Sequence, residues 1–260
     1  MTDTTEPPVI PDAQAVTTAD LTAALAAGWR DFLKAPMFGI VFGALFSVIG
    51  ITIYLQLVVQ GSSYWILPLA CGFPLVGPFL AVGLYEVSRE LEAGQKPTWP
   101  RIFRTILGQS QGQVPSMAFV VLFFYLVWVY LAHLVFALSF GLRPLTNVMT
   151  SADLLFSPQG ITMLLVGTIV GGALAALLFA VTVMAVPMIV DRDVDVVTAM
   201  IRSFTFVRDN AGTMALWAVI VVVLSILGSL PGFLGMILVF PVLGHATWHL
   251  YRRAYPRGDG

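Results

Sequence analysis

The chain has 260 residues, of which 58% are hydrophobic and 10% are charged, and its formal net charge is −1. A soluble domain carries about 25% charged residues, so this composition excludes an ordinary soluble protein, and the near-neutral charge gives no reason to expect a nucleic-acid partner. The single cysteine, Cys71, excludes an intramolecular disulfide and a CxxC metal clip. We therefore expect an all-α membrane protein whose main partner is the lipid bilayer.

The first segment, residues 1–18, is polar and proline-rich, and it lacks the basic start and apolar core of a signal peptide. We interpret it as a disordered cytoplasmic tail. The membrane domain is expected over residues 19–255, and residues 256–260 form a second short cytoplasmic tail.

Six apolar runs have about the 20 residues that a helix needs to cross the hydrocarbon core of a bilayer. The six predicted spans lie near residues 36–59, 64–86, 115–140, 161–190, 213–230 and 232–251. The last two are separated by GSLPGF, whose glycines and proline predict a tight turn.

An amphipathic segment precedes each odd-numbered span, at residues 18–36, 98–109 and 195–212. Thr18, Thr98 and Asp195 are placed to cap these three helices. In the first helix an apolar stripe is predicted at helical spacing, formed by Leu21, Leu25, Gly28, Trp29 and Phe32. The charged residues Arg30, Asp31 and Lys34 are expected away from it.

The other two amphipathic helices carry similar stripes. The second is formed by Ile102, Phe103, Ile106 and Leu107, and the third by Val197, Met200, Ile201, Phe204 and Val207. Helices of this kind lie in the membrane interface or pack against the cytoplasmic end of the bundle, and the sequence is compatible with both placements.

The basic residues predict the orientation of the chain. Twelve of the 13 lysines and arginines fall on one side of the six predicted spans: Arg30, Lys34, Arg89, Lys96, Arg101, Arg104, Arg192, Arg202, Arg208, Arg252, Arg253 and Arg257. Only Arg143 falls on the other side. Because basic loops stay in the cytoplasm, both termini are expected in the cytoplasm of a bacterial cell, with the protein in the inner membrane.

The even-numbered spans share a sequence mark. FPLVGPF at 73–79 and FPVLGHA at 240–246 both contain F-P-x-x-G, and each is followed by Leu-Tyr and then arginine, while VPMIVDR is a weaker copy in the fourth span. The mark comprises Phe73, Pro74, Gly77, Tyr85 and Arg89 in the first copy, Pro187, Asp191 and Arg192 in the second, and Phe240, Pro241, Gly244, Tyr251 and Arg252 in the third.

This mark divides the chain into three units, at about residues 19–95, 96–193 and 194–255. Each unit consists of an amphipathic helix, an outward span and an inward span that contains proline, which kinks a membrane helix. The predicted fold is therefore six transmembrane helices arranged as three parallel-repeat hairpins, each preceded by an amphipathic interfacial helix.

The stretches PLVGPFLAVGLYEVSRELEAGQKPTW, PMIVDRDVDVVTAMIRSF and GHATWHLYRRA resemble a family of uncharacterised bacterial integral membrane proteins, catalogued as a domain of unknown function. Some of its members carry the label of cytochrome c oxidase subunit I. The resemblance covers roughly residues 20–255 and implies a six-span inner-membrane protein. It implies no catalytic or binding residues, because none is established for the family.

The oxidase label conflicts with the histidine content. The oxidase label implies a haem–copper core with six histidine ligands, whereas this chain has His133, His245 and His249. At a rise of about 1.5 Å per residue, His133 and His245 differ in predicted depth by about 10 Å or more, which argues against one haem between them. We expect no cofactor.

His245 and His249 lie one helical turn apart in HATWH, a spacing that can hold a metal. The sequence offers no clear third ligand, so the alternative is an interhelical hydrogen bond for His245 and an interfacial position for His249. No HExxH, no GxSxG and no aspartate pair lies within the spans, so an enzyme is not expected.

Two classes of function stay open. One is an accessory or scaffolding protein that acts through membrane-protein partners at its amphipathic cytoplasmic face, and the other is a small permease or lipid-handling protein with a proline-kinked cavity. Gly167 and Gly171 form a G-xxx-G pair that permits close helix packing within the chain or between protomers.

Overall fold

A computed structural model describes residues 11–55, 66–109, 112–141, 156–192 and 194–257, without the side chains of residues 66–76. The described residues form helices and contain no strand. The helices are α1 (Thr18–Lys34), α2 (Pro36–Tyr54), α3 (Ile66–Glu92), α4 (Trp99–Gln109), α5 (Val114–Phe140), α8 (Pro158–Thr182), α9 (Ala185–Asp191), α10 (Val196–Asp209), α11 (Ala211–Ser229) and α12 (Met236–Ala254).

The three amphipathic segments form helices α1, α4 and α10, close to the predicted bounds. The first begins after Thr17, one residue earlier than predicted, because the Asp20 carboxylate accepts hydrogen bonds from the Thr17 backbone N–H at 2.9 Å and from its hydroxyl at 2.7 Å. Asp195 caps α10 as predicted, since its side chain accepts from the Thr198 backbone N–H at 2.9 Å. Asn210 ends that helix.

Helix α12 lies at the centre of the molecule, where it contacts α1, α2, α3, α9 and α11. Glycines let the neighbouring backbones approach it: a Cβ atom at Gly28 of α1 would lie 2.6 Å from the backbone nitrogen of Ala246. A Cβ at Gly43 of α2 would meet the backbone oxygen of Ile237. The amphipathic helix α1 is therefore packed into the protein core along one side, with no room for a larger side chain at Gly28.

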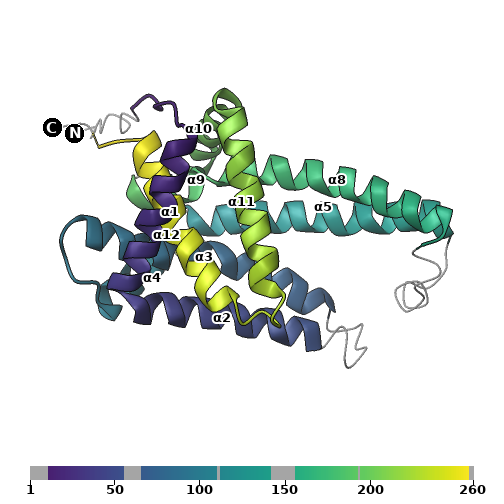
Figure 1. Cartoon of the computed structure of the whole chain (residues 1–260), viewed down its shortest axis with the longest axis horizontal. Coiled ribbons are helices and arrows are strands. Elements are labelled where there is room, and N and C mark those ends of the chain that lie inside the picture. Colours follow the sequence, from purple (N-terminus) through teal and green to yellow (C-terminus); the bar gives the residue numbers. More distant parts are fainter. Residues whose placement is uncertain (1–10, 56–65, 110–111, 142–155, 193, 258–260) are drawn as a thin grey trace, which may run out of the picture.

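Helices α5 and α8 pair side by side and project beyond the other helices along the longest axis of the molecule (Figure 1). Helix α11 runs across that direction in the same view. The consecutive pairs α2–α3, α5–α8 and α11–α12 all make contact, but they do not line up as copies along a common direction. The predicted repeat of three hairpins therefore stays a prediction.

Four helical segments among the described residues are long and apolar enough to cross a membrane: Pro36–Tyr54, Val114–Phe140, Pro158–Asp191 and Ala211–Ser229. They correspond to the first, third, fourth and fifth predicted spans. The second, at 64–86, lies partly outside the described residues, and the sixth corresponds to α12, whose last turns carry two histidines and two arginines. The structure thus establishes a helical protein with four candidate spans.

The fourth span is interrupted between α8 and α9. The Pro187 nitrogen cannot donate a hydrogen bond, and its ring disturbs the preceding turn. The Ser203 hydroxyl of α10 enters the gap, where it accepts from the Met184 backbone N–H at 3.1 Å and donates to the Ala180 carbonyl at 2.7 Å. These two backbone groups would bond each other in an unbroken helix, so Ser203 satisfies both at the kink.

The amphipathic helices each pack one edge of the apolar stripe inward and expose the other. Ile102 of α4 is buried, whereas Phe103 and Leu107 are more than half exposed. On α1, Trp29 of the predicted stripe is 43% exposed, whereas Asp31, which was predicted to lie away from the stripe, is buried. The reason is that α12 packs closely on α1 at Gly28 and brings His249 to Asp31 as a polar partner. The same two-sided arrangement recurs on α10, where Val197, Ile201 and Phe204 are exposed.

Residues 14–16, within the segment predicted as a tail, make hydrogen bonds to the folded part. Gln14 N donates to the Ala254 carbonyl at 2.8 Å, and Val16 N donates to Asn210 Oδ1 at 3.0 Å. Val16 is buried. Residues 1–10 lie outside the described residues.

Candidate functional site

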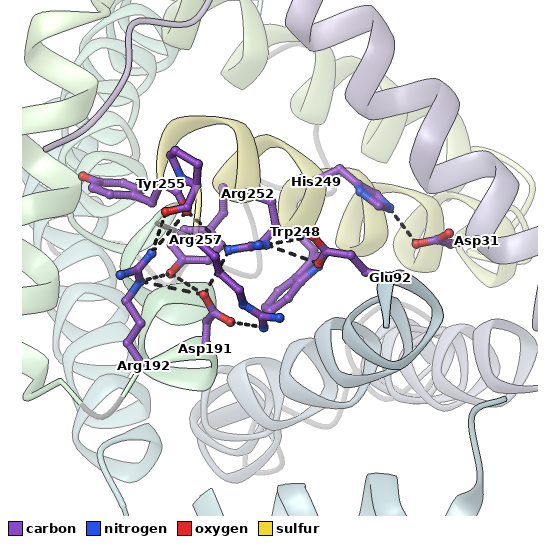
Figure 2. A network of polar contacts seen from close by, with 11 residues as sticks. Asp31, Glu92, Asp191, Arg192, Trp248, His249, Arg252, Tyr255 and Arg257 are labelled. Carbon is purple, nitrogen blue, oxygen red and sulfur yellow. Dashed lines mark hydrogen bonds and ion pairs between the residues drawn. The ribbon is translucent and has the colours of Figure 1, made fainter. Parts of the chain in front are cut away.

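A network of ion pairs gathers around Asp191 at the C-terminal end of α12 (Figure 2). Asp191 Oδ1 accepts from Arg257 at 2.8 Å, and Oδ2 accepts from Arg252 at 3.4 Å and from the Tyr251 hydroxyl at 3.1 Å. The side chain of Asp191 is almost wholly buried, so its charge needs these partners. The last residue of α9 is thereby attached to the end of α12.

Arg192 joins the same network from the other side. Its Nε donates to the Tyr251 hydroxyl at 3.0 Å, and its Nη2 donates to the backbone carbonyls of Tyr255 at 3.3 Å and Pro256 at 3.2 Å. These are the free carbonyls at the end of α12, where a cation is favourable. Burial raises the pKa of Tyr255 to about 12, and its phenol donates to the Arg202 carbonyl at 3.2 Å.

Glu92 extends the network to the end of α3. Its carboxylate accepts from Arg252 Nε at 3.0 Å and from the indole N–H of Trp248 at 3.2 Å. Trp248 is fully buried and stacks on Tyr85 of α3, with ring centroids 6.1 Å apart. The end of α12 therefore holds α3 and α9 together through a few charge-assisted bonds.

The two histidines of HATWH contact different residues. Ser88 Oγ lies 2.8 Å from His245 Nδ1, and both residues are fully buried. His249 Nε2 lies 2.6 Å from the Asp31 carboxylate, as Figure 2 also shows. Burial opposes ionisation of Asp31, but its hydrogen bonds with His249 and Ser88 prevail and hold the pKa of the carboxyl below its usual value.

The contact of His245 with Ser88 is an interhelical hydrogen bond of the kind that the sequence offered as the alternative to a metal pair. The described residues contain no group of three or more potential metal-ligating side chains, and each histidine already engages a neighbouring helix. His245 Nε2 is buried without a hydrogen-bond partner among the described atoms. The third histidine, His133, is exposed on α5 and lies 2.7 Å from the Val129 carbonyl of its own helix.

The residues of the sequence mark are partly brought together. Asp191, Arg192, Tyr251 and Arg252 contact one another directly, and Tyr85 reaches them through Trp248. Six other members lie apart from the network: Gly77, Arg89, Pro187, Phe240, Pro241 and Gly244. The side chains of Phe73 and Pro74 lie outside the described residues.

Apart from Gly77, these members have local contacts instead. Arg89 pairs with Glu86 of its own helix at 2.7 Å, and Phe240 stacks on Phe46 with ring centroids 4.4 Å apart. A Cβ at Gly244 would lie 2.7 Å from Leu84, whereas nothing lies within 4 Å of the same position at Gly77. The buried residues Pro187 and Pro241 lie inside α9 and α12.

The projecting α5–α8 pair carries an apolar groove of about 580 Å³ that opens to the surface. Gly167, Gly171 and Gly172 of α8 line it, together with Trp128 and Phe136 of α5. A Cβ at Gly171 would lie 2.7 Å from the Trp128 ring, whereas Gly167 and Gly172 have nothing within 4 Å. One glycine of the G-xxx-G pair thus packs within the chain, and the other borders the open groove.

Sequence reasoning missed three residues of this region, namely Asp31, Ser88 and Glu92. The signal for two of them was present: Ser88 and Glu92 lie one helical turn apart in LYEVSRELEAG, so they share a face of α3. Asp31 had no such signal, because its partner is more than 200 residues away in the sequence.

Residues 66–191 match the model of a family described as "Predicted integral membrane protein (DUF2189)". The resemblance to an uncharacterised family of integral membrane proteins is thereby confirmed over this part of the chain. No curated protein and no solved structure shows significant similarity to it.

Proposed function

We propose that the protein is an accessory or scaffolding protein of the bacterial inner membrane, with six transmembrane spans, and that it acts through other membrane proteins. In this proposal both termini face the cytoplasm, and the network around Asp191 lies at the cytoplasmic end of the bundle. The amphipathic helices α1, α4 and α10 lie at the same end, with their exposed apolar residues in the membrane interface.

The polar contacts support six crossings rather than four. Asp31 contacts His249, and Glu92 and Asp191 both contact Arg252. Groups in contact lie on one side of a membrane, so the chain between any two of them crosses it an even number of times. If α3 does not cross the membrane, α2 is the one crossing between Asp31 and Glu92. If α12 does not cross, α11 is the one crossing between Asp191 and Arg252. If all four candidate spans cross, an even number is reached when α3 and α12 cross as well, which supports the proposal of six spans.

The proposal of a scaffolding role rests on the surface of the α5–α8 pair. Its large apolar side chains point outward along both helices: Phe119, Phe123, Leu126, Tyr130, Leu134 and Leu138 on α5, and Ile161, Leu164, Leu165, Ile169 and Leu177 on α8. Small residues in the groove allow a second helix to approach closely. The groove is open along the surface and is not an enclosed chamber, which favours a docking role over passage of a solute.

Site-specific photocross-linking in intact cells tests this proposal. A cross-linker at Thr168, which lines the groove, is expected to capture a transmembrane helix of another protein, identified by sequencing the linked peptide. A cross-linker at Ile169, which is 70% exposed outside the groove, provides the matched control. Capture of no protein from Thr168, or equal capture from both positions, would contradict a docking groove.

The apolar lining of the groove also favours a second candidate, a lipid-handling protein or small permease. The groove exposes far more carbon than polar atoms, so an acyl chain can occupy it. In that case the cross-linker at Thr168 captures lipid and no protein, and the same experiment therefore separates the two candidates.

A further inference from the structure

A charged hollow of about 340 Å³ lies where the end of α3 meets α4, apart from the α5–α8 groove. Its walls combine both signs of charge: Glu86, Arg89, Glu90, Ala93, Gln95, Arg101 and Arg257. Glu86 and Glu90 lie one turn apart on α3 and so share a face, while Arg101 comes from α4 and Arg257 from beyond α12.

The two carboxylates are the unusual feature of this hollow. Glu86 is 4% exposed and Glu90 is 6% exposed. Glu90 Oε1 pairs with Arg101 at 3.0 Å, and the Thr98 backbone N–H also stabilises the charge of this carboxylate. Its second oxygen, Oε2, is buried and has no hydrogen-bond partner of good geometry among the described atoms. Burial raises the pKa of Glu90. A buried oxygen without a partner is costly, so a donor from outside the chain is expected to fill this place.

The three arginines supply the opposite charge at the rim. Arg89, Arg101 and Arg257 each hold a carboxylate, yet their side chains are 35%, 40% and 53% exposed. A guanidinium has five N–H donors. The three nitrogens of Arg101 also donate to Thr98, Gln95 and the Lys96 carbonyl, yet each of its two terminal nitrogens retains a second N–H, so all three arginines keep donors that can bind an anionic oxygen at the mouth of the hollow. The site therefore offers a buried acceptor and, near it, exposed donors.

We propose that this hollow binds a zwitterionic group in which a primary ammonium lies a few bonds from a phosphate, as in the head of an aminophospholipid. The ammonium donates to the free oxygen of Glu90, and the phosphate lies against Arg89 and Arg101. A simple anion leaves the Glu90 oxygen without a donor, and a simple cation is repelled by the three arginines. A group that carries both charges satisfies both walls.

The position of the hollow favours a lipid as the source of this head group. It lies just beyond the predicted end of the second span at residue 86, on the side that carries the basic residues. Helix α4, which provides Arg101, also exposes Phe103 and Leu107, against which an acyl chain can lie. This inference depends on the proposed membrane placement but not on a protein partner in the α5–α8 groove.

Native mass spectrometry of the purified protein tests the proposal, with phosphatidylethanolamine and phosphatidylcholine of the same acyl chains as probes. Both heads carry one phosphate and one positive nitrogen, but only the primary ammonium has N–H donors. We expect the ethanolamine lipid to bind about tenfold more tightly, which corresponds to one charge-assisted hydrogen bond. The mono- and dimethylated ethanolamine lipids are expected to bind with intermediate affinity, and this series needs no mutation.

Single substitutions test whether the lipid preference arises in this hollow. Glu90→Gln is expected to abolish the preference for the ethanolamine lipid, and Arg101→Gln to weaken binding of both lipids. Asp209→Asn, which removes an exposed carboxylate paired with Arg208 outside the hollow, is expected to bind as wild type. Equal affinity of the wild-type protein for both lipids, or an unchanged preference in a folded Glu90→Gln variant, would overturn the proposal.

Soluble O-phosphoethanolamine distinguishes the two sources of the head group. Displacement of the lipid only at concentrations far above those of the lipid itself supports a lipid ligand. Displacement at similar concentrations supports the same chemistry with a soluble ligand. Failure of O-phosphoethanolamine to compete at any concentration, together with equal binding of both lipids, argues against the site.

Discussion

The Ser203 hydroxyl bridges two backbone groups at the kink between α8 and α9. Most serines and threonines of the helices donate to the carbonyl one turn earlier on their own helix, as Ser139 does with Val135. Ser203 instead bonds another element, and it satisfies both a donor and an acceptor there. The local break after α8 and the packing of α10 against it thus depend on one buried oxygen.

Replacing Ser203 with alanine is expected to destabilise the protein by about 1–3 kcal/mol, because the Met184 N–H and the Ala180 carbonyl lose their partner in a buried site. Thermal unfolding in a mild detergent measures the change as a lower Tm. Ser139→Ala is the matched control: its hydroxyl bonds a carbonyl that already belongs to the helix, so we expect little change. Equal Tm values for the two variants would disprove the bridging role.

Single residues also mark the limit of what the sequence reveals. The i, i+4 spacing of His245 and His249 predicted that they share a face, and the interhelical bond of His245 was one stated alternative. The partner of His249 was not predictable, since Asp31 has the polarity of an exposed residue and only the packing of α1 on α12 buries it. Long-range pairs between charged residues leave no periodic signal in one sequence.

The helices themselves followed well from local patterns. Apolar periodicity and capping residues predicted α1, α4 and α10 within a few residues of their observed ends. Which edge of each stripe packs inward was not predictable, because it depends on the position of a neighbouring helix. Exposed Phe103 and buried Ile102 are adjacent in sequence and equally apolar, so only the fold separates their environments.

The α5–α8 pair offers a test at the scale of an element. Gly171→Leu is expected to lower the Tm, because the new side chain must displace the Trp128 ring, which lies 2.7 Å from the position of a Cβ. Overpacking of this kind costs about 1–3 kcal/mol. Gly167→Leu is expected to leave the Tm near that of wild type, since nothing lies within 4 Å of its Cβ position.

The same two variants separate folding from assembly. If the groove receives a partner helix, Gly167→Leu should abolish cross-linking from Thr168 while the monomer stays stable. A Gly167→Leu variant that unfolds as early as Gly171→Leu would mean that this part of the groove is filled within the chain. In that case the groove would not bind a partner helix.

At the scale of the whole molecule, the polar contacts at the end of α12 connect distant parts of the chain. Asp20 pairs with Arg253 at 2.7 Å, and Glu92 and Asp191 pair with Arg252. The sequence predicted that basic residues gather on one side of the membrane, but it did not show that the acidic residues there neutralise them. The arginines of this face are therefore largely paired with acidic residues of the same chain, and these pairs join the ends of different helices.

This arrangement makes the number of crossings testable with single cysteines in a Cys71→Ser background. Ala19, Ala93, Ala211 and Pro231 are exposed positions at helix ends or in turns. With six spans and cytoplasmic termini, a membrane-impermeant maleimide added outside the cell is expected to label only Pro231→Cys. The other three cysteines should react only after the membrane is permeabilised.

If only the four candidate spans cross, the pattern reverses at three positions. The cysteines at 93 and 211 then react from outside, and the one at 231 is protected. That result would place Glu92 and Arg252 on opposite sides of the bilayer, although they lie 3.0 Å apart, so it would overturn both the topology and the network. Positions 211 and 231 lie at the two ends of α11, and the two topologies predict opposite labelling for both, so they give the most decisive comparison.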